Sequence, residues 1–142
     1  MTSKTILMAY QDDSWVKSLS SLSSDMGCRV EATRLVSDVL KKIRGKDPCV
    51  ILLDAEMEGI EAYDLVPLFK KVRPRVQIIV ISSEESIQFA KRLRDAGIFY
   101  QAMKPIDSGE IRSAVACAFE KIDREQPEKW FFPFLTPGPV PA

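Results

Sequence analysis

The chain has 142 residues, which is the size of one ordinary domain, and 46% of them are hydrophobic, which is enough for a packed core. Basic and acidic residues number 20 each, so the formal net charge is zero and no basic excess indicates contact with a nucleic-acid backbone. The absence of histidine excludes histidine-based catalytic triads and histidine-ligated zinc.

Five short apolar runs alternate with five segments whose apolar residues recur at helical spacing. The runs predict strands at residues 5–9, 28–32, 50–54, 76–81 and 98–103. The helical patterns lie at residues 15–26, 35–43, 65–72, 87–93 and 111–122. Runs that are apolar throughout are typical of parallel strands buried on both faces. The chain is therefore predicted to form a flavodoxin-like, doubly wound α/β fold, with a five-stranded parallel sheet in the order 2-1-3-4-5 and five helices.

Several residues mark where helices begin. Asp12 and Asp13 are placed to cap the first helix, and Asp107 with Glu110 forms a capping-box pattern for the last one. Pro67 lies inside the third helical pattern, where proline removes a backbone hydrogen bond. We expect the third helix either to kink there or to begin near this residue.

The last part of the chain has a different composition. We interpret residues 1–124 as one folded domain and residues 125–142 as a tail rich in proline and aromatic residues. Its aromatic residues are Trp130, Phe131, Phe132 and Phe134. Exposed together, they would form an apolar patch of the kind that marks an interaction site. We expect them to pack near the last helix of their own domain or on a neighbouring subunit; the alternative is a free arm that awaits a partner.

The compartment follows from what the chain lacks. No apolar run is long enough to cross a bilayer, and the first residues do not show a signal-peptide pattern. Of the three scattered cysteines, Cys28, Cys49 and Cys117, two lie in apolar surroundings, as small core residues do in a reducing compartment. We therefore expect a cytoplasmic protein that makes no direct contact with nucleic acid or with a membrane.

Three polar residues stand at the ends of apolar strands: Asp54, Ser82 and Lys104. Because the carboxyl ends of parallel strands meet at one edge of a sheet, these side chains are expected to lie together. A carboxylate there can be the nucleophile that forms an acyl phosphate, while an ammonium and a hydroxyl hold phosphoryl oxygens. The pattern indicates phosphoryl transfer with Asp54 as the reactive group. The alternative is that Asp54 only caps the following helix.

The segments that carry these residues, 53–59, 80–83 and 103–105, resemble those of the response-regulator receiver domains of two-component signalling. The resemblance covers about residues 5–122, and the chain is similar to the chemotaxis regulator that consists of a receiver alone. It implies that a histidine kinase or a phosphotransfer protein phosphorylates Asp54 in the presence of Mg²⁺. It also implies that Ser82 and Lys104 bind the phosphoryl group, that a cis bond precedes Pro105, and that the chain is not an enzyme.

One departure from the family concerns its acidic pair, which directly follows the first strand. An ungapped count back from Gly27 puts Tyr10 and Gln11 at these positions, and Asp12 and Asp13 come next. Either the loop is shifted, so that both aspartates serve, or only Asp12 reaches the metal; helix capping is their alternative role. We expect Mg²⁺ to bind more weakly than to a receiver with the full pair.

Further departures lie around the predicted pocket. Glu56 stands where the family's side chain faces the phosphoryl group, so it either supplies a metal ligand, through its backbone or its side chain, or repels the phosphoryl group. Glu58 replaces the usual proline, and Gln101 occupies the position of the switch aromatic, three residues before Lys104. The metal ligands that the resemblance implies are Asp12, Asp54 and Glu56, with Asp13 as a further candidate.

Two functions follow. In the first, phosphate on Asp54 draws Ser82 and Lys104 inward and changes the face made by the fourth helix, the fifth strand and the fifth helix, where a downstream protein or a second copy binds. In the second, the chain is a pseudo-receiver, a protein-binding or dimerisation module without phosphorylation, which the altered acidic pair favours. A third function, a phosphatase of the haloacid-dehalogenase type, also uses an aspartate nucleophile at a strand end. The sequence disfavours it, because such enzymes usually have a second aspartate where Glu56 stands. No effector domain follows residue 122, so we expect output through contacts or through an effector on a separate piece.

Overall fold

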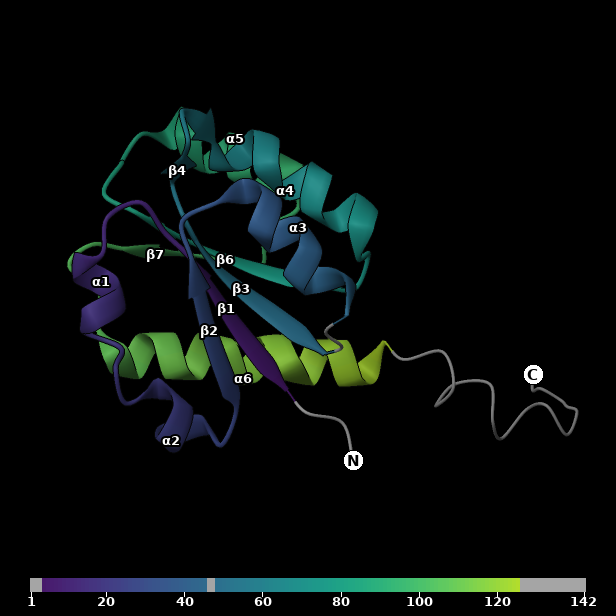
Figure 1. Ribbon diagram of the computed structural model, residues 1–142. Coiled ribbons are helices and arrows are strands. Elements are labelled where there is room, and N and C mark those ends of the chain that lie inside the picture. Colours follow the sequence, from purple (N-terminus) through teal and green to yellow (C-terminus); the bar gives the residue numbers. More distant parts are fainter. Residues whose placement is uncertain (1–3, 46–47, 126–142) are drawn as a thin grey trace, which may run out of the picture.

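The computed structural model describes residues 4–45 and 48–125 (Figure 1). Its centre is a sheet in which all neighbouring strands are parallel. In chain order the strands are β1 (Thr5–Ala9), β2 (Arg29–Thr33), β3 (Cys49–Asp54), β6 (Gln77–Ser82) and β7 (Tyr100–Met103). They lie in the order β2-β1-β3-β6-β7, so the predicted five-stranded order 2-1-3-4-5 and the flavodoxin-like fold are confirmed.

Helices cover both faces of the sheet (Figure 1). One face carries α3 (Val36–Arg44), α4 (Ala62–Val72) and α5 (Ile87–Ala96). The other carries α1 (Ser14–Lys17), α2 (Leu22–Met26) and α6 (Ser108–Arg124). Because successive strand residues point to opposite faces, Leu52 belongs to the core that includes α6, and Leu53 to the core that includes α4. Burial on both faces accounts for the unbroken apolar run before Asp54.

The first predicted helix is interrupted, so the described part of the chain has six helices where five were predicted. The break falls at residues 18–21, which include three serines. The Ser18 hydroxyl donates to the Trp15 carbonyl at 2.8 Å. Serine hydroxyls compete for backbone groups in this way and lower helix propensity. Leu19 and Leu22 stay buried on either side of the break, so the apolar pattern holds although the helix does not continue.

A short hairpin that the sequence analysis did not predict follows β3. It pairs β4 (Glu56–Met57) with β5 (Ile60–Glu61) in antiparallel fashion. Both turn residues, Glu58 and Gly59, have positive φ, 52° and 76°, as a two-residue type I′ turn requires. Proline cannot adopt a positive φ, so Glu58 permits a turn that the proline expected there would not.

The first residues of α4 and α6 test two predictions, the start of the third predicted helix and the capping box of the last one. α4 begins at Ala62, so the expectation that this helix begins near Pro67 is wrong. The Asp107 side chain accepts a hydrogen bond from a backbone amide in the first turn of α6 and caps it as predicted. Glu110 instead accepts a hydrogen bond from the Tyr100 hydroxyl, so the second half of the capping box does not form.

Apart from Glu125, the C-cap residue of α6, the tail lies outside the described residues, and so does the prediction that its aromatic residues pack near α6. The boundary after residue 124 stays a prediction. Within residues 4–45 and 48–125, no helix has the length and apolar character needed to cross a membrane.

Candidate functional site

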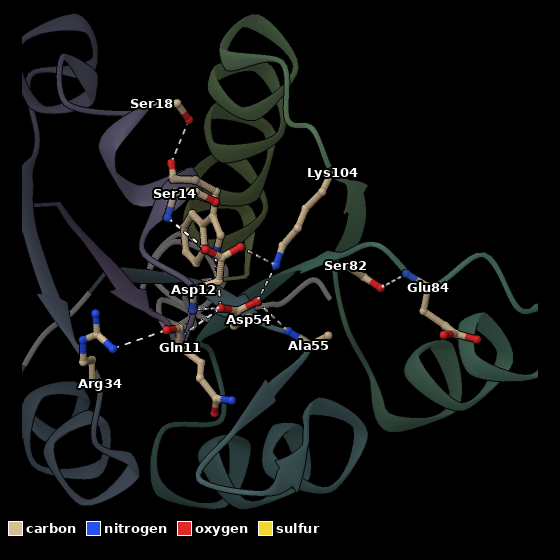
Figure 2. Close-up of polar contacts among 11 residues, drawn as sticks. Gln11, Asp12, Ser14, Ser18, Arg34, Asp54, Ala55, Ser82, Glu84 and Lys104 are labelled. Carbon is tan, nitrogen blue, oxygen red and sulfur yellow. Dashed lines mark hydrogen bonds and ion pairs between the residues drawn. The ribbon is translucent and has the colours of Figure 1, made fainter.

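The three strand-end residues lie at the carboxyl edge of the sheet. Asp54 ends β3, Ser82 ends β6, and Lys104 directly follows β7. Figure 2 shows that Lys104 reaches toward Asp54, whereas Ser82 points to Glu84 in the loop after β6. The parallel order of the strands therefore brings these residues to one edge, and two of the three side chains are in contact.

The Asp54 carboxylate is buried, with 4% of the residue exposed, and it accepts five hydrogen bonds (Figure 2). Its Oδ2 accepts from the backbone amides of Gln11 and Asp12, at 2.8 and 2.9 Å, and from Nε1 of Trp15 at 3.2 Å. Its Oδ1 accepts from the next backbone amide and from Lys104 Nζ, both at 3.2 Å. An unpaired buried carboxylate is costly, so these donors are what make its burial tolerable.

Asp54 does not cap the following helix. α4 begins at Ala62, and its N-cap residue is Glu61, so the capping alternative is wrong. The carboxylate instead contributes to a pocket that opens to the surface. The pocket is lined by Gln11, Asp12, Asp54, Ala55, Glu56 and Lys104.

Lys104 joins Asp54 to a second carboxylate. Its Nζ lies 3.2 Å from Asp54 Oδ1 and 3.2 Å from Asp12 Oδ2. Hydrogen bonds from Ser14 and from the Lys104 ammonium hold the pKa of Asp12 below its usual value. The peptide bond before Pro105 is cis, as the resemblance implied. One ammonium thus neutralises part of the charge of two neighbouring carboxylates.

The loop after β1 directs Asp12 into the site and Asp13 away from it. Asp13 forms ion pairs with Lys17 at 3.8 Å and with Arg34 at 3.7 Å. The Tyr10 ring lies against the Arg34 guanidinium, outside the set of pocket-lining residues. Of the two aspartates, only Asp12 lines the pocket. Its Oδ1 also accepts a hydrogen bond from the Ser14 amide at 3.0 Å, at the start of α1, so Asp12 has the capping contact as well. Asp13 stands at the N-cap position but makes no capping hydrogen bond with its side chain.

Gln11 links the site to α3. The side-chain Oε1 of Gln11 accepts a hydrogen bond from the Glu58 backbone amide at 3.1 Å, while the backbone amide of Gln11 donates to Asp54. The Glu58 carboxylate accepts from the Val36 amide at 2.8 Å, in the first turn of α3. A carboxylate at this position pairs an amide that has no partner within the helix and is favoured by the helix dipole. The two departures from the family pattern, at positions 11 and 58, therefore contact each other.

The Ser82 hydroxyl is fully buried and accepts a hydrogen bond from the Glu84 amide at 2.8 Å. It lines a second hollow that shares three residues with the pocket around Asp54. Gln101, at the expected switch position, is partly buried on β7, and its Nε2 lies 3.8 Å from Met103 Sδ. Neither side chain contacts Asp54 in this arrangement.

Trp15 is the residue of the site that the sequence analysis missed. Its helical spacing with Leu19 and Leu22 is typical of a core residue, and it is indeed only 3% exposed. Its indole Nε1 nevertheless donates to Asp54 Oδ2. The sequence offered one general indication, because the N–H of a buried indole usually has a hydrogen-bond acceptor. The spacing of the apolar residues does not indicate which residue that acceptor is.

The residues around the pocket fit Mg²⁺, which is bound by one or two carboxylates together with other oxygens and several waters. Asp12 and Asp54 supply two carboxylates that already share one cationic partner, Lys104. Glu56 is exposed and lines the same pocket, where it offers a carbonyl and a carboxylate. The described part of the chain holds no cluster of three or more His, Cys, Asp or Glu side chains suited to a metal. The site thus offers the paired carboxylates of Asp12 and Asp54, with Glu56 at the rim of the same pocket and water to complete the ligand set.

Comparison with known proteins identifies the family. The model of the response regulator receiver domain matches residues 6–116, so the chain belongs to the receiver-domain family. The DNA-binding transcriptional regulator NtrC of Azospirillum brasilense is 30% identical over 115 residues, which are 81% of this chain and 24% of that protein. The chain spans about a quarter of the length of the curated relatives it matches.

Solved structures show the same fold. A CheY-like receiver domain protein from Methanospirillum hungatei JF-1 superposes with a TM-score of 0.76 at 18% identity, over 89% of this chain and 100% of that one. The beryllofluoride-activated NtrC4 receiver domain dimer gives a TM-score of 0.75 at 23% identity, over 83% and 98%. The chain is therefore a receiver domain of the response-regulator type in both sequence and fold.

Proposed function

We propose that the chain is a phosphoacceptor switch in two-component phosphorelay signalling, with Asp54 as the residue that accepts the phosphoryl group. The observation that carries this proposal is the convergence of Asp54, Asp12 and Lys104 on one pocket at the carboxyl edge of the sheet. The pseudo-receiver alternative drew its support from the missing acidic pair. Because Asp12 stands in the pocket, that support is weakened.

The residues of the pocket have separate roles in this proposal. An oxygen of Asp54 attacks the phosphorus atom of the donor, and the Lys104 ammonium then moves from the carboxylates to a phosphoryl oxygen. The Ser82 hydroxyl exchanges its bond with the Glu84 amide for one with the phosphoryl group. When bound, Mg²⁺ would supply positive charge that offsets the negative charge gathered in the pocket. Asp12, Asp54 and Glu56 would hold it, and Asp13, which faces away, is left out of the set.

Mass spectrometry of the intact chain tests the phosphoacceptor. Incubated with acetyl phosphate and Mg²⁺, the wild type should gain the mass of one phosphoryl group, and Asp54→Asn should gain none, because an amide cannot form the acyl phosphate. Hydroxylamine, which cleaves acyl phosphates, should remove the added mass. A wild type that gains no mass at any Mg²⁺ concentration would favour the pseudo-receiver instead.

The proposed partners follow from this role. A histidine kinase or a phosphotransfer protein supplies the phosphoryl group in the cytoplasm, and the chain itself turns over no substrate.

The output face is the one formed by α5, β7 and α6. It contains an apolar groove, here called the β7–α6 groove, which is lined by Phe99, Tyr100, Glu110, Ser113, Ala114 and Cys117. One related receiver was solved as an activated dimer, which supports a second copy of the chain as the occupant.

A charge placed in the β7–α6 groove should prevent this association. Ser113 is exposed in the groove, so Ser113→Arg leaves the core intact but buries a charge in the interface, and the association of the phosphorylated chain should weaken roughly tenfold or more. Ala116 is also exposed on α6 but borders a different hollow, so Ala116→Arg is the matched control. Sedimentation velocity with and without acetyl phosphate measures the effect. If the phosphorylated wild type stays monomeric, a second copy is not the partner.

A further inference from the structure

Within residues 4–45 and 48–125, the Trp15 indole is the one side-chain donor on Asp54 Oδ2. Its Nε1 lies 3.2 Å from this oxygen, and both residues are buried. The two other donors to Oδ2 are the backbone amides of Gln11 and Asp12, which remain whatever side chains those positions carry. The ring packs edge-on against Tyr10, with 6.5 Å between centroids, so packing and a polar contact together hold the indole in place.

We propose that Trp15 is a positioning residue that stabilises the unphosphorylated carboxylate of Asp54 and thereby shortens the life of the phosphorylated state. This inference rests on the proposed function, in which Asp54 accepts the phosphoryl group. The hydrogen bond from the indole is strongest while Oδ2 carries part of the carboxylate charge. It weakens once that charge has moved to the phosphoryl group.

The movement of negative charge to and from Asp54 during phosphorylation and hydrolysis determines whether Trp15 slows or speeds each step. Oδ1 is the attacking oxygen, because three N–H donors occupy Oδ2, whereas Oδ1 accepts from one backbone amide, that of Ala55, and from the Lys104 ammonium, which sits on a flexible side chain. The new bond joins Oδ1 to phosphorus, and the bond from phosphorus to acetate breaks, with its electron pair leaving on the acetate. Oδ2 then becomes a neutral carbonyl oxygen. In hydrolysis, water attacks phosphorus, the Oδ1–P bond breaks, and the negative charge returns to Asp54.

The indole therefore acts on both steps with opposite signs. It favours the charged carboxylate over the acyl phosphate, so it opposes phosphorylation. It also stabilises the charge that develops on Asp54 as the phosphoryl group leaves, so it speeds hydrolysis. A preorganised donor at a site of developing charge costs no rearrangement during the reaction, and the burial of Trp15 keeps water from replacing it.

Replacing Trp15 with phenylalanine removes the N–H and keeps an apolar ring. Because a hydrogen bond to a charged acceptor is about twice as strong as a neutral one, we expect the acyl phosphate to last about three to ten times longer in Trp15→Phe. The fraction phosphorylated by acetyl phosphate at steady state should rise, with each variant measured at a Mg²⁺ concentration that saturates it. Tyr10→Phe is the matched control, since it alters the same ring pair without touching Asp54, and it should decay like the wild type.

Nuclear magnetic resonance of the indole N–H separates this contact from a general loosening of the core. The chain has two tryptophans, Trp15 and Trp130, and the signal lost in Trp15→Phe identifies the first. We expect Asp54→Ala, and phosphorylation of the wild type, to move the Trp15 signal upfield and to leave Trp130 unchanged.

The outcomes distinguish this inference from the proposed function. If the wild type is phosphorylated but Trp15→Phe decays at the wild-type rate or faster, the role of Trp15 is overturned and the phosphoacceptor stands. If the indole N–H resonance of Trp15 does not shift in Asp54→Ala, the proposed role of Trp15 is overturned as well. If the wild type is never phosphorylated, both proposals fail.

Discussion

Asp12→Asn should weaken Mg²⁺ binding by more than about tenfold and slow phosphorylation by acetyl phosphate to a similar extent, because it removes one of the two pocket carboxylates that pair with Lys104. Mg²⁺ titration by calorimetry and intact-mass kinetics measure the two effects. A neutral amide oxygen is a poorer ligand for a hard cation than a carboxylate, and it leaves the Lys104 ammonium with Asp54 as its one carboxylate partner.

Asp13→Asn is the control that makes this experiment decisive. Asp13 is the same residue type at the next position, but it pairs with Lys17 and Arg34 outside the pocket. Its replacement should leave Mg²⁺ binding nearly unchanged. If the two variants lose affinity equally, both aspartates reach the metal and the loop after β1 differs in solution from the arrangement described here.

The effect of Asp12→Asn should also depend on pH. The pKa of Asp12 is depressed below 3.8, chiefly by the hydrogen bonds from Ser14. A carboxyl group with a depressed folded-state pKa contributes its charge above the ordinary value and loses it as the pH falls through the folded value. The difference in Mg²⁺ affinity between wild type and Asp12→Asn should therefore be full at neutral pH and shrink only as the pH falls through the folded-state pKa of Asp12, which lies below 3.8.

Lys104→Met should have the second large effect, with opposite signs on metal binding and on stability. Without the ammonium, Mg²⁺ no longer competes with a resident cation, so its affinity should rise several-fold. In the absence of Mg²⁺, the buried Asp54 carboxylate loses its charged partner, and the free energy of unfolding should fall by about 2 kcal/mol. Urea denaturation with and without Mg²⁺ measures both changes.

Lys17→Met serves as the comparison for Lys104→Met. Lys17 pairs with Asp13 on the surface, where its side chain is 78% exposed, and such pairs contribute well under about 1 kcal/mol. Its replacement should change neither stability nor Mg²⁺ affinity measurably. A Lys104→Met chain that is as stable as the wild type without Mg²⁺ would show that the backbone amides and Trp15 suffice to hold Asp54.

The five buried strands and the three edge residues could be predicted because both depend on local patterns, and the strand order followed from the flavodoxin-like fold that the alternation of strands and helices indicates. Unbroken apolar runs are needed wherever a strand is buried on both faces, and a polar residue at the end of such a run must lie at the edge of the sheet. The break in the first helix was not predicted, because the apolar spacing of Leu19 and Leu22 continues through it. The hairpin after β3 was missed because its two strands are too short for any alternation to show.

The choice between neighbouring polar residues could not be made in the same way. Asp12 and Asp13 have the same chemistry, and the sequence left open whether both of them serve or only Asp12; the direction of the loop places Asp12 at Lys104 and turns Asp13 toward Arg34. In the sequence, Glu58 was noted only as the residue that replaces the family's usual proline. Its contact with the start of α3 depends on a turn with positive φ, which the sequence analysis did not predict.

The sequence by itself determined the doubly wound sheet and the edge position of Asp54, Ser82 and Lys104, because hydrophobic periodicity and strand ends are local properties of the chain. The receiver-domain family followed from the resemblance of the three segments that carry these residues. Only the tertiary structure decided which partners the Asp54 carboxylate has. The donors Trp15 and Lys104 lie 39 and 50 positions away from it in the chain, on opposite sides in sequence. No spacing rule connects residues so far apart; they meet because parallel strands order β1, β3 and β7 so that the loops at their carboxyl ends share one edge.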